Sequence, residues 1–252
     1  MTRILLCGCN GKMGRVVTAC VADRKDCRIV AGVDIHTVSG DYPVYANPWD
    51  CTEAVDVMID FSHPSCVHDI LAVARQRKIP TVICTTGLSD EQIADIHSTA
   101  DTVPVFFSAN MSLGVNLLAE LAKRAAAILG NSFDVEIIEK HHNQKIDAPS
   151  GTALMLADAV SAGLSYEPNY VFDRHSVREK RAKNEIGLSA VRGGTIVGEH
   201  DILFAGHDET ITLSHTAMSK EIFAVGAINA AVFIADNKPA GLYSMKELVS
   251  NM

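Results

Sequence analysis

The first 108 residues alternate short, nearly continuous apolar runs with segments whose apolar residues recur at helical spacing. Such runs are typical of parallel strands covered on both faces, and the segments between them are typical of the covering helices. The pattern therefore predicts an α/β fold with a parallel sheet. The predicted strands are 3–7, 28–34, 55–61, 81–84 and 103–108, and the predicted helices are 15–22, 64–77 and 89–99.

The pattern changes after a long predicted helix over 113–129, which Gly130 ends. Residues 134–140 alternate polar with apolar side chains, as a half-solvated strand does. Glycines separate three further strand-like segments, 188–192, 198–204 and 209–216, which predicts an antiparallel sheet. We expect two domains: 1–112 with 222–252, and 113–221, with the terminal helices returning to the first.

A glycine-rich turn follows the first predicted strand. It is Gly8-Cys9-Asn10-Gly11-Lys12-Met13-Gly14, a helix follows it, and the second strand ends at Asp34. Strand, glycine turn, helix, strand and terminal acid is the order of a Rossmann-like dinucleotide-binding domain, in which the acid binds the adenine ribose. The spacing departs from G-x-G-x-x-G, because Cys9 stands where the first glycine is usual. The strand context nevertheless favours cofactor binding over a purely structural turn.

The second candidate site is the stretch 139–160, where His141, His142 and Lys145 precede Ser150-Gly151-Thr152 and a predicted helix from Ala153. Pro149 disfavours helix before that point, and Ser150 or Thr152 can cap the helix that follows. The free N–H groups at a helix N-terminus bind anions such as carboxylates, and Lys145 adds a positive charge and a proton. The alternative is a capped helix behind a loop of solvated histidines, and spacing alone leaves both open.

Composition narrows the class of protein. The net charge of −8 argues against a nucleic-acid partner. The apolar run 223–235 is too short to span a membrane, and the early glycines interrupt any signal-peptide pattern. Seven cysteines, all within the first 84 residues and without a C-x-x-C pair, favour a reducing compartment. We therefore expect a soluble cytoplasmic protein that does not bind membranes.

These motifs together resemble those of the dihydrodipicolinate reductase family of bacterial lysine biosynthesis. The most specific part is His141-His142-Asn143-Gln144-Lys145-Ile146-Asp147-Ala148-Pro149-Ser150-Gly151-Thr152-Ala153, which is similar to the family signature E-x-H-H-x-x-K-x-D-A-P-S-G-T-A. The turns at 8–15, 85–87 and 108–112 also match. The resemblance implies a Rossmann-like domain, a second α+β domain with an open mixed sheet, and a homotetramer built through that sheet.

The resemblance also implies a reaction, the NAD(P)H-dependent reduction of hydroxy-tetrahydrodipicolinate to tetrahydrodipicolinate, with hydride added to ring C4. His141 and Lys145 would be catalytic, with Lys145 as proton donor. His142, Ser150, Gly151 and Thr152 would hold the carboxylates of this small dicarboxylate substrate. The residues implied in cofactor binding are Gly8, Gly11, Lys12, Met13, Asp34, Thr85, Thr86, Gly87, Ser108, Ala109, Asn110 and Met111.

The sequence departs from the family at the cofactor site. Family members often have Arg directly after the ribose-binding acid, where it receives the phosphate of NADPH, whereas Ile35 and His36 follow Asp34 here. We therefore expect NADH to be favoured, because Asp34 would repel a 2′-phosphate. Lys12, Arg15 or His36 could still accept that phosphate, so the use of both cofactors stays open.

Three alternatives remain. One is a nicotinamide-binding sensor that has lost catalytic activity. The presence of Lys145 and the two histidines argues against it. Another is a homoserine or semialdehyde dehydrogenase on the same scaffold; the thiol-dependent type needs a cysteine beyond the first domain, and the last one is Cys84. A metal site at His141 and His142 lacks a third ligand nearby in the sequence, so we expect no metal. His200, His207 and His215 are expected to be solvated residues of the sheet.

Overall fold

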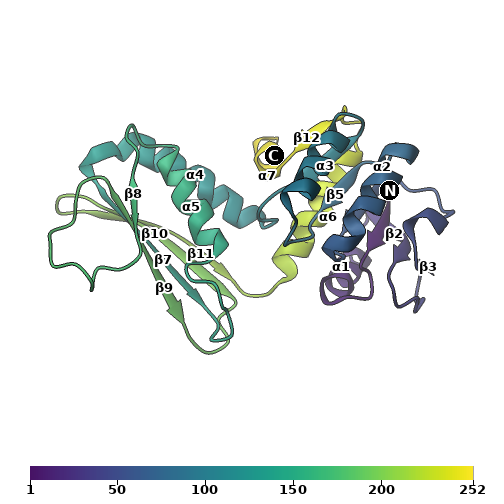
Figure 1. Cartoon of the computed structure of the whole chain (residues 1–252), viewed down its shortest axis with the longest axis horizontal. Coiled ribbons are helices and arrows are strands. Elements are labelled where there is room, and N and C mark those ends of the chain that lie inside the picture. The colour runs from purple at the N-terminus through teal and green to yellow at the C-terminus, as the bar shows by residue number, and fades with distance from the viewer. Residues whose placement is uncertain (252) are drawn as a thin grey trace. The chain divides into compact units, whose positions relative to one another are not determined.

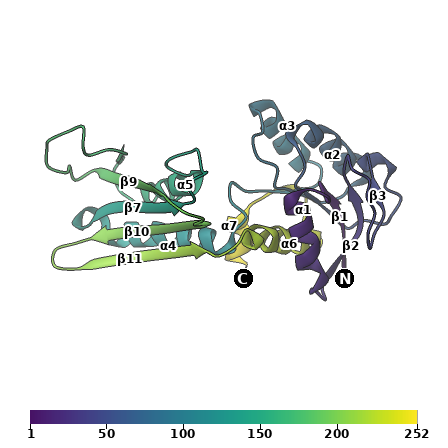
Figure 2. The same cartoon turned by 90° about the horizontal axis from the view of Figure 1, so that it is seen from below.

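The computed structural model describes residues 1–251 and divides the chain into two compact units (Figures 1 and 2). Unit 1 comprises Met1–Leu113 and Glu221–Met252, and unit 2 comprises Gly114–Lys220. The limits expected from the sequence differ from these by one residue at each boundary.

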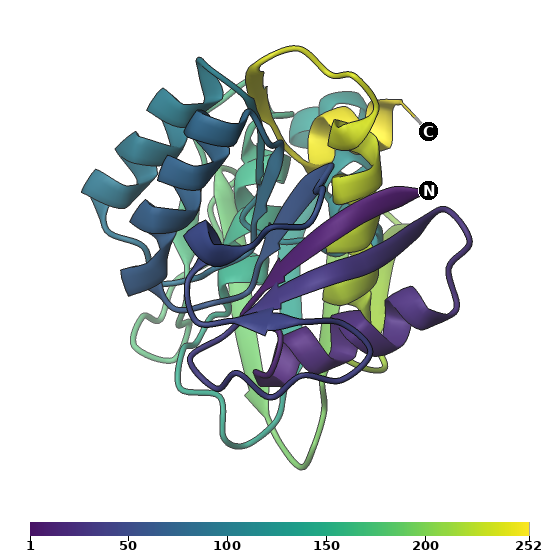
Figure 3. The same ribbon diagram turned by 90° about the vertical axis from the view of Figure 1, so that its right-hand side faces the viewer.

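Unit 1 contains a seven-stranded parallel sheet with the order β12-β6-β5-β4-β1-β2-β3 (Figure 3). Strands leave β1 in both directions, which is the doubly wound arrangement of Rossmann-like domains, so the predicted fold class is confirmed. Two strands were not predicted, β3 and β12, because two or three residues are too few to show a pattern. The strands are β1 Thr2–Cys7, β2 Cys27–Val33, β3 Val44–Tyr45, β4 Val57–Asp60, β5 Thr81–Ile83, β6 Pro104–Phe107 and β12 Gly241–Tyr243.

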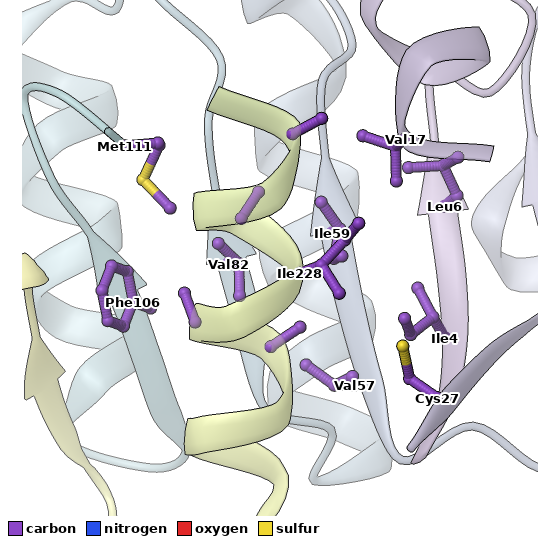
Figure 4. Packing of buried hydrophobic residues seen from close by; sticks show 14 of the residues in the cluster. Ile4, Leu6, Val17, Cys27, Val57, Ile59, Val82, Phe106, Met111 and Ile228 are labelled. Atoms are coloured by element: carbon purple, nitrogen blue, oxygen red, sulfur yellow. The ribbon is translucent and has the colours of Figure 1, made fainter. Parts of the chain in front are cut away.

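Helices cover both faces of this sheet, which explains why its strands are apolar on both sides. On one face, α6 (Glu221–Ala235) packs with α1 (Lys12–Ala22) and α7 (Met245–Ser250). Figure 4 shows Ile228 of α6 against Val57 and Ile59 of β4. The other face is covered by α2 (Pro64–Arg77) and α3 (Asp90–Ala100), and a 3-10 turn, η1, spans Pro48–Asp50.

Unit 2 contains a five-stranded mixed sheet with the order β11-β10-β7-β9-β8 (Figure 2). The antiparallel sheet predicted from the glycine-separated segments is wrong for β9, which pairs parallel with β7, while β10 pairs antiparallel with β7 on its other side. Side-chain alternation gives no information on strand direction, so the sequence could not make this distinction. The strands are β7 Asp134–His141, β8 Asn169–Val171, β9 Glu185–Arg192, β10 Gly198–Ala205 and β11 Thr210–Ala217, of which β8 lies in a polar segment where none was predicted.

Two helices cover one face of the unit 2 sheet. The apolar side chains of α4 (Leu113–Leu129) and α5 (Gly151–Ser161) pack on alternate residues of β7 and β10, and η2 (Gly130–Ser132) follows α4. The same face becomes polar toward one end, because Glu139 and His141 follow Val135 and Ile137 at alternate positions of β7. Buried polar side chains therefore gather beside the N-terminus of α5.

Candidate functional site

The glycine turn of unit 1 depends on residues without side chains. Gly8 has a φ of +76°, and a Cβ added there would lie 2.6 Å from the carbonyl oxygen of Phe61. A Cβ on Gly14 would lie 2.2 Å from the carbonyl oxygen of Gly8, so only glycine lets α1 approach the turn this closely. The turn therefore presents bare backbone in front of the N-terminus of α1, which is what a pyrophosphate group requires.

Asp34 anchors this turn. Its carboxylate accepts the N–H of Asn10 at 2.9 Å and the N–H of His36 at 3.0 Å. Asn10 in turn donates its side-chain amide to the carbonyl oxygen of His36 at 2.6 Å. These residues line a cavity of about 400 Å³, large enough for the adenosine portion of a dinucleotide. Of the predicted cofactor residues, Gly8, Gly11 and Asp34 line this cavity, with Asn10, His63, Ser65 and Asp69 as additions.

The other predicted cofactor residues lie outside the cavity lining, and their role remains a prediction. Lys12 and Met13 form the first turn of α1. Thr85, Thr86 and Gly87 follow β5, and Ser108, Ala109, Asn110 and Met111 follow β6, at the carboxyl ends of the parallel strands.

A buried aspartate connects the loop after β4 with the loop after β5. Asp60, at the end of β4, accepts the hydroxyl of Thr85 at 2.7 Å and the N–H of Ser62 at 2.9 Å. Burial raises the pKa of Asp60, and the two hydrogen bonds only partly offset this effect. Its signal in the sequence was an acid that ends a continuous apolar strand.

In unit 2, the site is built around Glu139, whose side chain is 1% exposed. Its carboxylate accepts the Nδ1 of His141 at 2.6 Å, the N–H of Ser150 at 3.0 Å, and both Nη atoms of Arg192 at 2.7 Å each. Burial acts to raise the pKa of Glu139, but the hydrogen bonds from Arg192, His141 and Ser150 outweigh it, so the pKa is lowered. An ionised carboxylate thus connects β7, β9 and the start of α5.

The contact with Glu139 fixes the ring of His141. A nitrogen that faces an ionised carboxylate carries the hydrogen, so Nε2 is the ring nitrogen left to exchange a proton. A Cβ on Gly198 would lie 3.1 Å from this Nε2, so the glycine keeps space beside it. His142 is half-buried and its carbonyl oxygen accepts the N–H of Lys145 at 3.2 Å. The two adjacent histidines therefore have different surroundings.

Lys145 and Ser150 lie on either side of the turn that leads into α5. The Nζ of Lys145 lies 2.8 Å from the Oδ1 of Asp147. Ser150 is the N-cap of α5 and its Oγ accepts the N–H of Ala153 at 3.1 Å. Gly151 is exposed, Thr152 is half-buried, and space is open where a side chain on Gly151 would stand. The turn thus presents a cation and a helix N-terminus, the elements of a carboxylate site.

His200 is where the expectation from the sequence is wrong. It was expected to be solvated, but it is 4% exposed, its ring lies 5.1 Å from that of His141, and its Nε2 lies 3.2 Å from the Oγ of Ser150. Burial, with a smaller effect of His141, lowers the pKa of His200 to about 4. The signal was available, because His200 alternates with Ile202 and Phe204 on the buried face of β10. His207 is exposed and His215 is half-buried.

The arrangement supports proton transfer and anion binding. Residues 141–151 carry three useful groups: a histidine that a buried carboxylate holds, a lysine, and a helix N-terminus. Among residues 1–251, no group of three or more His, Cys, Asp or Glu side chains is arranged to hold a metal ion. In the same part of the chain, no helix has both the length and the apolar character needed to cross a membrane.

Comparison with known proteins shows similarity along the whole chain. The family model described as "Dihydrodipicolinate reductase, N-terminus" matches residues 2–111, and "Dihydrodipicolinate reductase, C-terminus" matches residues 114–249. A 4-hydroxy-tetrahydrodipicolinate reductase of Caldanaerobacter subterraneus subsp. tengcongensis is 51% identical, covering 99% of this chain and 98% of the relative. One from Clostridium tetani is 48% identical, with 97% and 96% covered.

A solved structure is similar in the same way. It is a dipicolinate-bound dihydrodipicolinate reductase from Paenisporosarcina sp. TG-14, with a TM-score of 0.79 and 27% identity. The match covers 97% of each chain.

The buried state of His200 predicts how stability depends on pH. The ordinary pKa of histidine is 6.5 and that of native His200 is about 4, so between these values the unfolded chain binds a proton that the native protein does not. The contribution of His200 is therefore complete above pH 6.5 and is lost as the pH falls toward 4. Between pH 7.5 and 5, it should lower the free energy of unfolding by about 1–2 kcal/mol. Urea unfolding at both values measures this change.

The comparison uses His200→Gln and a matched control, His207→Gln, whose side chain is 98% exposed in the native protein. The control should lose as much stability between the two pH values as the wild type, and His200→Gln should lose less. Equal losses in all three proteins would contradict the assignment of a buried, neutral His200.

Proposed function

Because this chain belongs to the dihydrodipicolinate reductase family, we propose that it reduces 4-hydroxy-tetrahydrodipicolinate to tetrahydrodipicolinate with a nicotinamide cofactor. The resemblance found in the sequence motifs is confirmed at the level of the family, and the chain is an oxidoreductase. The observation that carries the proposal is the turn of unit 2, in which Glu139 holds His141 and the N-cap Ser150 while Lys145 stands between them in the chain.

In the proposed reaction, this turn binds a dicarboxylate and supplies a proton. The N–H groups at the start of α5, with Ser150, Gly151, Thr152 and His142, would orient the carboxylates. The Lys145 ammonium would donate a proton to the ring, and His141 would give or take a proton at Nε2. A bound nicotinamide would supply the hydride, to ring C4. Dipicolinate bound to the Paenisporosarcina relative supports this substrate class.

For the cofactor, we propose that unit 1 binds NADH in preference to NADPH. The cavity beside the glycine turn is lined by Asp34, Ile35 and His36, so the first side chain after β2 is an anion. A carboxylate there accepts ribose hydroxyls and repels a 2′-phosphate. His36 and Lys12 leave some use of NADPH open.

Steady-state rates with each cofactor on the hydroxylated dicarboxylate test the activity and the preference together. We expect turnover with both cofactors and a higher kcat/KM with NADH. Asp34→Asn should shift the ratio of the two kcat/KM values toward NADPH by about tenfold, the effect of roughly 1.4 kcal/mol of lost repulsion. The matched control is Asp69→Asn, because Asp69 is an exposed carboxylate that lines the same cavity. If Asp69→Asn shifted the ratio as far, Asp34 would not set the preference, and absence of turnover would refute the function.

Replacement of the proposed proton donor should separate chemistry from binding. Lys145→Ala should lower kcat by about 10²- to 10⁴-fold, the usual contribution of a general acid. The dissociation constant of NADH, followed by its fluorescence, should stay within twofold. Lys180→Ala serves as the control, because Lys180 is exposed in the same unit and away from the turn. Unchanged turnover in Lys145→Ala would end the assignment of Lys145 as proton donor.

We also propose that the protein acts in lysine and diaminopimelate biosynthesis, in the cytoplasm. All seven cysteines are unpaired, which fits a reducing compartment. Growth of a reductase-deficient bacterium without added diaminopimelate, restored by this chain but not by its Lys145→Ala variant, would support the role. Failure of the wild-type chain to restore growth would argue against it.

A homotetramer is proposed from the outer face of the unit 2 sheet, which α4 and α5 leave uncovered. The outward side chains of β11 are Thr210, Thr212, Ser214 and Thr216, and Leu203 of β10 pairs with Thr212. A row of small side chains, three of them β-branched, beside an apolar residue can pack closely against another sheet.

Light scattering after gel filtration should give four times the chain mass of 27.1 kDa. Thr212→Lys should lower this mass, because it places a charge on the proposed interface. Ile128→Lys is the control, since Ile128 is exposed on α4, which covers the opposite face of the sheet. A wild-type mass of a single chain would refute the tetramer.

A further inference from the structure

Asp147 carries a carboxylate inside the proposed substrate turn. Its Oδ1 lies 2.8 Å from the Nζ of Lys145. The hydrogen bond from Lys145 lowers the pKa of Asp147, and the N–H of Gly151 contributes in the same direction. Gly151 is the first residue of α5. One side chain of the protein therefore pairs with the ammonium that the proposed function assigns to a substrate carboxylate, four residues before the N-terminus of α5.

The backbone around Asp147 is held while its side chain is open to solvent. The carbonyl oxygen of Asp147 accepts the Nη2 of Arg192 at 2.6 Å, and Arg192 is fixed in turn by Glu139. The side chain of Asp147 is 57% exposed, whereas that of Lys145 is 22% exposed. The carboxylate can therefore turn away from Lys145 into solvent without moving the chain that carries it.

We propose that Asp147 is an internal substitute for one carboxylate of the substrate, which displaces it from Lys145 on binding. This inference rests on the proposed function, because it uses the same turn and the same dicarboxylate. In the free protein, Asp147 balances the positive charge of the Lys145 ammonium and orients it. A ligand that brings its own carboxylate replaces this contact, whereas a neutral ligand would leave the ammonium without a partner. Asp147 thereby contributes to specificity for acids.

The proposal predicts the sign of a change in affinity. Asp147→Asn keeps the shape of the side chain and removes its charge, so the competing anion is lost and the acidic ligand should bind more tightly. Partly exposed ion pairs are weak, and the gain should be about two- to fivefold in the dissociation constant. A residue with a purely structural role in the turn would have the opposite effect, because its replacement would loosen the site and weaken binding.

Titration calorimetry with pyridine-2,6-dicarboxylate, a flat analogue of the substrate, tests the proposal on the full chain. The matched control is Asp208→Asn, which makes the same change in net charge and removes a carboxylate 3.3 Å from the Nε2 of His207. Asp208 lies in the turn between β10 and β11, at the end of the sheet where Ala205 pairs with Asp134, and so away from the site. We expect tighter binding by Asp147→Asn, unchanged binding by Asp208→Asn, and no gain from Asp147→Asn in a Lys145→Ala background.

The other outcomes overturn the proposal in distinguishable ways. Weaker or unchanged binding by Asp147→Asn refutes it and leaves the proposed function intact. An equal gain in Asp208→Asn reduces the effect to net charge and also refutes it. A gain that persists without Lys145 shows that Asp147 and the ligand carboxylate do not compete for Lys145. Absence of binding by the wild type would refute the proposed substrate class, and this inference with it.

Discussion

A carboxylate that is almost completely buried remains ionised only when hydrogen bonds replace the water it has lost. Glu139 meets this condition through both Nη atoms of Arg192, the ring of His141 and the N–H of Ser150. His141 lies two residues further along β7, Arg192 belongs to β9, and Ser150 is the N-cap of α5. Removing the charge of Arg192 would leave an unpaired buried anion, which typically costs about 3–5 kcal/mol. The geometry of the site and the stability of this end of the sheet are therefore coupled.

This coupling explains how a solvent-accessible turn can be well ordered. His141 ends β7, Ser150 is the N-cap of α5, and Arg192 ends β9, so secondary structure fixes all three partners of Glu139. The chain from His142 to Pro149 is held at both ends by this carboxylate and in its middle by the bond from Arg192 to the carbonyl oxygen of Asp147. Lys145 and Asp147 can then move their side chains while their backbone stays in place. A binding group carried on a fixed chain starts close to its productive position.

Unit 1 uses carboxylates at strand ends for the same purpose. Asp34 follows β2 and Asp60 ends β4, and each accepts N–H or hydroxyl groups from the loops beyond the sheet. Beyond the carboxyl ends of the parallel strands, the N–H and hydroxyl groups of the loops have no neighbouring strand to bond to. A short acidic side chain at the strand end supplies acceptors for them. Close packing also holds the chain after β6. A Cβ on Gly226 of α6 would lie 1.7 Å from the carbonyl oxygen of Met111, so this helix approaches the chain after β6 at a distance that only glycine allows.

The sequence by itself determined the elements whose signal is local. Continuous apolar runs marked the central strands of unit 1, and glycines marked the turn before α1. The stretch from His141 to Thr152 was recognisable because its residue types are unusual together. The tertiary structure alone decided which strands are neighbours, and through that the parallel pairing of β9 with β7 and the pairing of the short β3, β8 and β12. It also decided that Arg192 meets Glu139, because contacts between residues 53 positions apart follow from the pairing of β9 with β7 and leave no periodic trace in the chain.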